Sequence, residues 1–190
     1  MADDTTPCSA CGREILRATA ERRFGMCAPC HRNSLKPPEV LFEEAVLARI
    51  DATIGPFTRH EEALEKLQSL PKGYALCFAA HHVVSEIMNG GASQLYANST
   101  WPLILTAEQA AREAGVPEVA LVLREIVYYH RQKGRSRLER QLDDDFFASI
   151  PGGWDKSLKQ LDDEFFGVAD DAESVIQRLC RDRRELFNEP

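Results

Sequence analysis

Four cysteines near the N-terminus have a spacing that is typical of a metal site. They form two C-x-x-C pairs, CSAC and CAPC, separated by fifteen residues, and the predicted ligands are Cys8, Cys11, Cys27 and Cys30. Zn²⁺ prefers a tetrahedron of soft ligands, which two such turns joined by a short hairpin can supply. We therefore expect a structural zinc ion. The alternative, disulfide pairing, is less favoured because we expect the chain to be cytoplasmic.

A zinc ion held by four thiolates has no open position for water, so a catalytic zinc is not expected. His31 follows Cys30 directly and could replace one thiolate, but an exposed histidine is the simpler interpretation. Residues 1–36 are too few to bury much apolar surface, so we expect the metal to hold this segment folded.

The stretch NSLKPPEV predicts a linker after the cysteines, because its paired prolines stiffen the chain and disfavour helical angles before them. It divides the sequence into a zinc-binding module with the start of the linker, residues 1–36, and a larger domain, residues 37–190. The first segment has six basic and four acidic residues, and the second has seventeen basic and twenty-six acidic residues. The larger domain therefore carries the negative charge.

The larger domain shows helix signals and few strand signals, which predicts an all-α fold. Apolar stripes bounded by glycine, proline and capping residues predict helices at 40–55, 58–70, 74–88, from Ala92, 106–115, 117–134, in the repeated segments 141–147 and 160–166, and from about Ala172. Thr58 and Thr106 are the predicted N-caps, with Thr58 and Glu61 at capping-box spacing. The segment 74–88 is apolar on nearly all faces, which predicts a central, buried helix.

The stretch EIMNGGASQLYANS is expected to form a corner between two helices. Gly90 and Gly91 can adopt the left-handed conformation that closes a helix, and Ala92 can open the next one. Gln94 and Asn98 are four residues apart on one helical face, where their amides are expected to bond the backbone groups exposed at the corner. A ligand pocket at this corner is the alternative interpretation.

Carboxylates are concentrated in residues 141–173, where ten acidic residues face two lysines. The repeat QLDDDFF and QLDDEFF predicts two short helices that bury Leu and Phe and expose their acids. The predicted contact residues are Asp143, Asp144, Asp145, Asp162, Asp163 and Glu164. Such an array can imitate the spacing of DNA phosphates and attract a basic groove. The alternative is a polar helix face that only keeps the protein soluble.

The sequence gives little support for catalysis. Cys77 and His81 are four residues apart on a predicted helix, but that helix is apolar on most faces, so the pair is interpreted as core. His82 and Glu86 have the same spacing and are expected to form a hydrogen-bonded or salt-bridged contact. The sequence contains no G-x-S-x-G, Walker, H-E-x-x-H or G-x-G-x-x-G motif, so we expect no enzyme activity.

The motif N-G-G, then Gln-aromatic, then Asn-Ser, followed by the LDDxFF segments, resembles the C-terminal domain of the bacterial DNA-mimic protein family over about residues 40–175. The matching residues are Asn89, Gly90, Gly91, Gln94, Tyr96, Asn98 and Ser99, while Ala92 stands where an aromatic is common. The resemblance implies an all-helical fold, frequent dimerisation, and, in members that act as mimics, a carboxylate-lined surface that occupies a DNA-binding protein. The zinc module lies outside the resemblance.

The leading hypothesis is a non-enzymatic, acidic interaction protein that binds a basic partner, which DNA mimicry would make a DNA-binding protein. One alternative is nucleic-acid binding by the zinc module, whose arginines could face phosphates; they are Arg13, Arg17, Arg22, Arg23 and Arg32. Another is an antitoxin or immunity protein that inhibits a basic toxin. Apolar stretches are too short to span a membrane, and the acidic N-terminus indicates a cytoplasmic protein.

Overall fold

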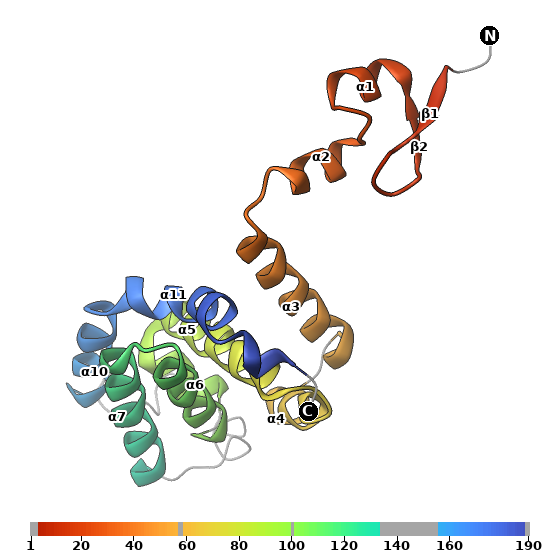
Figure 1. The fold of residues 1–190 in the computed structure, drawn as a ribbon. Helices are drawn as coiled ribbons and strands as arrows, with labels where there is room; N and C mark the ends of the chain where they lie inside the picture. The colour runs from red at the N-terminus through yellow and green to blue at the C-terminus, as the bar shows by residue number, and fades with distance from the viewer. Residues whose placement is uncertain (1–3, 57–58, 100, 134–155, 189–190) are drawn as a thin grey trace, which may run out of the picture. The chain divides into compact units, whose positions relative to one another are not determined.

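The computed structural model describes residues 4–56, 59–99, 101–133 and 156–188 (Figure 1). By internal contacts the chain divides into two compact units, Met1–Phe42 and Glu43–Pro190. The predicted fold class is confirmed: the chain is mainly α-helical, and its four N-terminal cysteines lie together. No helix in the described part of the chain combines the length and the apolar composition that a bilayer crossing requires.

The N-terminal unit begins with a small hairpin. Strands β1 (Thr5–Pro7) and β2 (Glu14–Leu16) pair antiparallel, with Thr6 opposite Ile15. Two short helices follow, α1 (Arg17–Arg22) and α2 (Ala28–Ser34). The only apolar side chains buried among the described residues of this unit are Cys8, Ala20 and Cys27. So small a core cannot offset the conformational entropy of folding by itself, which is the physical reason to expect a metal here.

Helix α3 (Pro38–Ile54) starts with proline at its first position and ends before Gly55, whose φ is +73°. In the second unit it is followed by α4 (His60–Leu67), α5 (Lys72–Asn98), α6 (Trp101–Glu113) and α7 (Pro117–Lys133). The C-terminal elements are α10 (Lys156–Phe166), α11 (Ala169–Asp182) and a 3₁₀ turn, Arg184–Phe187.

Helix α5 is the central element of the second unit (Figure 1). It packs against α4, α6, α10 and α11, and α6 packs in turn against α7. Its fully buried side chains include Leu76, Val83, Ile87 and Leu95, and Leu103 of α6 is fully buried as well. The prediction of a central, buried helix over 74–88 is therefore confirmed.

Several helix ends differ from the prediction. Helix α6 starts at Trp101, so Thr106 is not its cap but an interior residue whose hydroxyl donates to the carbonyl of Pro102. Helix α4 starts at His60 with Arg59 at the N-cap, and the predicted cap Thr58 lies outside the described residues. Helix α11 starts at Ala169, earlier than predicted, because Asp170 and Asp171 suit the positive end of the helix dipole.

The glycine corner exists as a kink inside α5. Gly90 has φ −160° and ψ 21°, and Gly91 has φ 73° and ψ −173°, so the helix is interrupted at these two residues. A positive φ with extended ψ is accessible to glycine and strained for other residues. The predicted corner is confirmed, although the chain continues as a second helical segment of the same element.

Candidate metal centre and acidic surface

The four N-terminal cysteines come from two turns. Cys8 and Cys11 flank the loop after β1, where Gly12, with φ +74°, donates its N–H to the carbonyl of Cys8. Cys27 precedes α2 and Cys30 lies in its first turn. A backbone hydrogen bond from Ser9 N–H to the carbonyl of Gly25 joins the two turns at 3.0 Å. The backbone therefore brings the two C-x-x-C pairs together.

The sulfur atoms fit a tetrahedral ion. All four Sγ atoms lie within 4.8 Å of one another, and Cys11 Sγ is 3.8 Å from Cys27 Sγ. A tetrahedral zinc ion with Zn–S bonds of about 2.3 Å separates its sulfurs by about 3.8 Å. The predicted cluster of Cys8, Cys11, Cys27 and Cys30 is thus present and could hold a metal ion. His31 is not among the clustered ligands.

The pKa values of two of these thiols are shifted in opposite directions. Hydrogen bonds from backbone N–H groups, first that of Cys27 at 3.2 Å, lower the pKa of Cys8 to about 6. Contacts with the sulfurs of Cys27 and Cys11 raise the pKa of Cys30 to about 12. Four thiolates so close together repel one another, and a divalent cation is the natural way to neutralise them.

The second copy of the acidic repeat lies on α10. Leu161 and Phe165 are buried and Asp163 and Glu164 are exposed, as the amphipathic pattern predicts, whereas Phe166, which was also expected to be buried, is 49% exposed. The first copy, with Asp143, Asp144 and Asp145, lies outside the described residues.

Asp162 lies inside the protein, with only 8% of its surface exposed. Its carboxylate accepts a hydrogen bond from the N–H of Ala92, the first residue after the glycine corner. A Cβ atom added to Gly91 would lie 2.6 Å from this carboxylate, so the corner requires glycine there. Burial raises the pKa of Asp162, which the Ala92 N–H partly offsets. The expectation that Asp162 contacts a partner is corrected: it caps a helix start within the fold.

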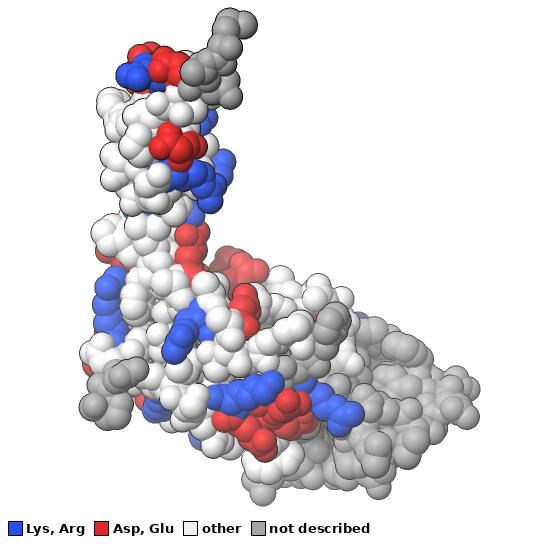
Figure 2. Space-filling model, turned by 90° about the vertical axis from the view of Figure 1, so that its right-hand side faces the viewer, with Lys and Arg blue, Asp and Glu red and all other residues white. Residues whose placement is uncertain are grey.

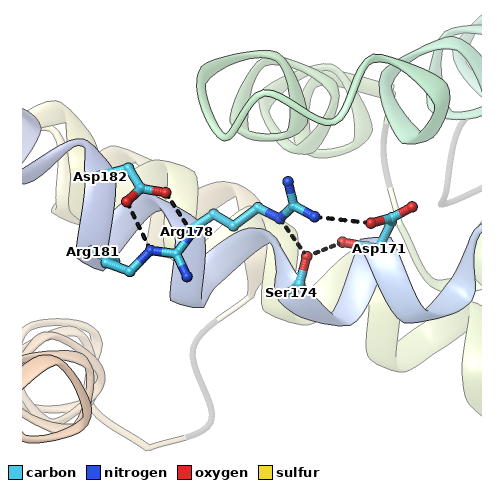
Figure 3. A network of polar contacts seen from close by, with 5 residues as sticks. All are labelled: Asp171, Ser174, Arg178, Arg181 and Asp182. Atoms are coloured by element: carbon cyan, nitrogen blue, oxygen red, sulfur yellow. Dashed lines mark hydrogen bonds and ion pairs between the residues drawn. The ribbon is translucent and has the colours of Figure 1, made fainter. Parts of the chain in front are cut away.

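The next carboxylates, on α11, are partly neutralised (Figure 3). Arg178 donates to Asp171 at 3.0 Å and to Ser174 at 2.9 Å, and Arg181 makes two bonds of 2.7 Å to Asp182. The hydrogen bonds from Arg181 lower the pKa of Asp182. In Figure 2, carboxylates of the described residues lie next to basic side chains in several places. Asp171 and Asp182 are therefore part of local ion pairs.

Four exposed carboxylates near the α10–α11 junction are not neutralised in this way. Among the side chains that the structure describes, no ion pair involves Asp163, Glu164, Asp170 or Glu173. Only Glu164 accepts a hydrogen bond, from the amide of Gln160 at 2.8 Å. We call these four residues the junction carboxylates. All four are exposed at the surface of the second unit.

The amides of the glycine corner bind a side chain rather than the backbone. Gln94 and Asn98 both donate to one oxygen of Glu86, at 3.0 and 2.9 Å. His82 approaches the other oxygen at 3.8 Å, which confirms the predicted His82–Glu86 contact. The prediction that the amides satisfy exposed backbone groups is therefore wrong.

The remaining motif residues also make structural contacts. Tyr96 packs edge to face on Tyr129 of α7, and the buried Ser99 lies 3.4 Å from the ring nitrogen of His82. A cavity of about 300 Å³ lies nearby, between α5 and α11, and of the motif residues only Asn89 lines it. The corner is mainly a brace within the fold.

Cys77 and His81 do not form a nucleophile and base. Cys77 is fully buried, whereas His81 is exposed. Contact with the thiol of Cys180 and burial raise the pKa of Cys77 well above its usual range. The thiolate form that nucleophilic chemistry requires is therefore disfavoured. Cys77 and Cys180 are free thiols that contact each other in the core.

The fold and these sites define a helical body and an N-terminal unit whose four cysteines could hold a metal ion. Comparison with models of known families matches residues 68–183 to the family described as DMP19-like protein. The match covers more than half of the chain, so the protein belongs to this family, which is the DNA-mimic family that the glycine motif resembles. The cysteine module lies outside the matched residues. No curated protein and no solved structure matches the chain.

Proposed function

We propose that this protein is a non-enzymatic interaction protein whose helical body binds a basic, DNA-binding protein in place of DNA. Membership of the DMP19-like family supports a DNA-mimic class of function. The observation that carries the proposal is the pair Asp163 and Glu164, exposed and without an ionic partner among the described residues.

The position of this pair on α10 favours a contact function over mere solubility. Asp163 and Glu164 lie in the last turn of α10. That turn contains no basic residue. The C-terminal end of a helix carries partial negative charge, so carboxylates there cost stability, typically about 0.3–1 kcal/mol each. A surface selected only for folding and solubility would place acids at the other end. The cost is consistent with selection for binding.

The other two junction carboxylates extend the same surface. Asp170 lies in the first turn of α11, where the helix dipole stabilises it, and Glu173 follows one turn later. Carboxylates three or four residues apart stand about 5–6 Å apart at Cβ, close to the spacing of phosphates on a strand. Asp170 has a sufficient structural explanation, so it widens the proposed surface without carrying the proposal.

We also propose that the four cysteines bind a structural zinc ion. Zinc would cross-link the β1–β2 loop to the start of α2 and supply the folding free energy that the small core lacks. Because four thiolates fill a tetrahedron, the ion would position the module and would have no open site for water.

Charge reversal tests the proposed contact. Asp163→Lys with Glu164→Lys should abolish salt-sensitive capture of a DNA-binding protein from a lysate of the source cells. The matched control reverses two exposed glutamates on α7, Glu118→Lys with Glu125→Lys, and changes the net charge equally. Equal loss of capture in both variants would mean that net charge alone acts. Unchanged capture in the α10 variant would refute the proposal.

A further inference from the structure

Phe24 of the N-terminal unit has a strained backbone conformation, and its side chain makes little packing contact that would offset the strain. Phe24 has φ +51° and is the only non-glycine residue among those described with a positive φ. Its side chain is 84% exposed, so it buries almost no apolar surface. The left-handed region is costly for a side chain with a Cβ, and glycine or asparagine is the usual occupant.

The turn itself explains the backbone but not the phenylalanine. It is fixed by hydrogen bonds from Gly25 N–H to the carbonyl of Ala20 at 2.8 Å and from Met26 N–H to the carbonyl of Arg23 at 2.9 Å. These hydrogen bonds position Cys27 in the cysteine cluster, and they would form equally well with glycine at position 24. Strain that persists without a packing benefit is an indication of function.

The surroundings of Phe24 indicate the kind of ligand. The ring of His31 lies nearly parallel to that of Phe24, at 19° with 6.2 Å between ring centroids. Arg22 and Arg23 precede Phe24, and Arg32 follows His31. Among the described residues, no carboxylate forms an ion pair with these three arginines. Within this described part of the chain, Arg22 donates only to the carbonyl of Ala18, at 3.0 Å. An exposed aromatic ring beside arginines without a carboxylate partner is the combination that stacks bases and contacts phosphates.

We propose that the N-terminal unit binds single-stranded nucleic acid, with a base stacked on Phe24 and phosphates contacted by Arg22, Arg23 and Arg32. The unit Met1–Phe42 has six basic and five acidic residues, so its net charge of +1 is compatible with an anionic strand and the local cluster of arginines, rather than the net charge, supports the contact. This binding uses different residues from the junction carboxylates and stands or fails separately from the proposed function.

The experiment measures binding of the zinc-loaded, full-length protein to a fluorescent oligo(dT) of about 16 nucleotides by anisotropy at about 50 mM salt. Phe24→Ala should weaken binding about 5- to 100-fold, and Phe24→Trp should retain it. The control Leu35→Ala removes an apolar side chain of the same unit that is 72% exposed, and should leave affinity within about two-fold.

Three further measurements separate base stacking from effects on folding and from charge alone. Phe24→Gly relieves the positive φ, so it should keep the unfolding midpoint and zinc retention of the wild type while losing the same affinity. On an abasic strand of equal charge, wild type and Phe24→Ala should bind equally, because no base remains to stack. Arg22→Gln with Arg23→Gln should reduce the salt slope by about 1.4.

Three results with oligonucleotides would overturn the proposal. They are no salt-dependent binding of the wild type at low salt, binding to a duplex as tight as binding to the single strand, and equal affinity of Phe24→Ala and wild type for oligo(dT). A protein ligand for Phe24, found without oligonucleotide binding, would overturn it as well.

Discussion

The carboxylate of Asp162 on α10 accepts the backbone N–H of Ala92 on α5, across 70 residues of sequence. Ala92 is the first residue of a helical segment, whose initial N–H groups have no partner within the helix. The side chain that caps this segment therefore comes from another helix. The contact joins the acidic repeat to the N-G-G motif and gives both a structural reason to occur in one sequence.

The Asp162 cap predicts a pH-dependent effect of substitution. Because burial raises its pKa, the folded chain holds this proton more tightly than the unfolded chain, and stability from this group is lost as pH rises through the folded pKa. Asp162→Asn keeps an oxygen for the Ala92 N–H without the charge. Its free energy of unfolding relative to wild type should therefore increase as pH rises from about 4 to about 7.

The companion variant Asp162→Ala removes the acceptor and leaves the Ala92 N–H buried. It should be less stable than Asp162→Asn by about 1–3 kcal/mol at every pH, as measured by urea unfolding. Equal stability of the Asn and Ala variants would show that the hydrogen bond contributes nothing.

Glu86 is predicted to hold the glycine corner together. Glu86→Ala deprives the amides of Gln94 and Asn98 of their acceptor and should lower the free energy of unfolding by about 1–3 kcal/mol. Glu86→Gln keeps one acceptor oxygen and should lose less. The control Glu125→Ala, at an exposed site on α7, should change stability by less than about 0.5 kcal/mol. Comparable losses of unfolding free energy in Glu86→Ala and Glu125→Ala would show that Glu86 does not stabilise the corner.

Glu113 predicts acid sensitivity in the second unit. Its carboxylate accepts a hydrogen bond from Lys72 at 2.8 Å and forms an ion pair with Arg183 at 2.6 Å. Both partners lower the pKa of Glu113, and Lys72 has the larger effect. The folded-state pKa lies below the unfolded value, so this stability is present above about pH 4.3 and is lost as pH falls.

Glu113→Gln should cost up to about 1 kcal/mol at neutral pH, a small value because the partners are partly exposed, and nothing once the carboxylate is protonated in acid. A double-mutant cycle with Lys72→Met should show that the two losses are not additive. Additive losses would mean that the pair does not interact in solution.

Metal removal should affect one unit and spare the other. Chelation of one zinc ion per chain, or the substitution Cys27→Ser, should unfold the N-terminal unit, because its described core contains almost no apolar residues. Trypsin should then cut rapidly after Arg13, Arg17, Arg22 and Arg23, while the helical circular dichroism of the body persists. Protease resistance that survives complete removal of the metal would refute a structural zinc.

The parts predicted correctly from sequence are those set by local chemistry. The cysteine cluster follows from ligand type and spacing, and the breaks at Gly55, Gly91 and Gly115 follow from the backbone freedom of glycine. The errors involve contacts between distant segments. Periodicity leaves Asp162 on the polar edge of its helix, and nothing local indicates that Ala92 lies against it. Thr106 has the residue type of a cap, but the apolar residues 101–105 before it already belong to α6.

The interpretation of Gln94 and Asn98 failed for a related reason. The amides were correctly placed on one face, but their acceptor, Glu86, lies eight and twelve residues earlier, across the kink. The geometry of that kink depends on Gly90 and Gly91, and helical spacing cannot be extended through them. Helical spacing pairs Glu86 with His82 alone, whereas the second carboxylate oxygen of Glu86 accepts hydrogen bonds from both amides.

The most direct test of the central claim is competition with DNA. A DNA-binding protein captured by the wild-type chain should be released by double-stranded DNA at concentrations near that protein's own affinity for DNA, and should not bind Asp163→Lys with Glu164→Lys. DNA mimicry predicts mutually exclusive binding. A stable complex of chain, partner and DNA together would contradict it.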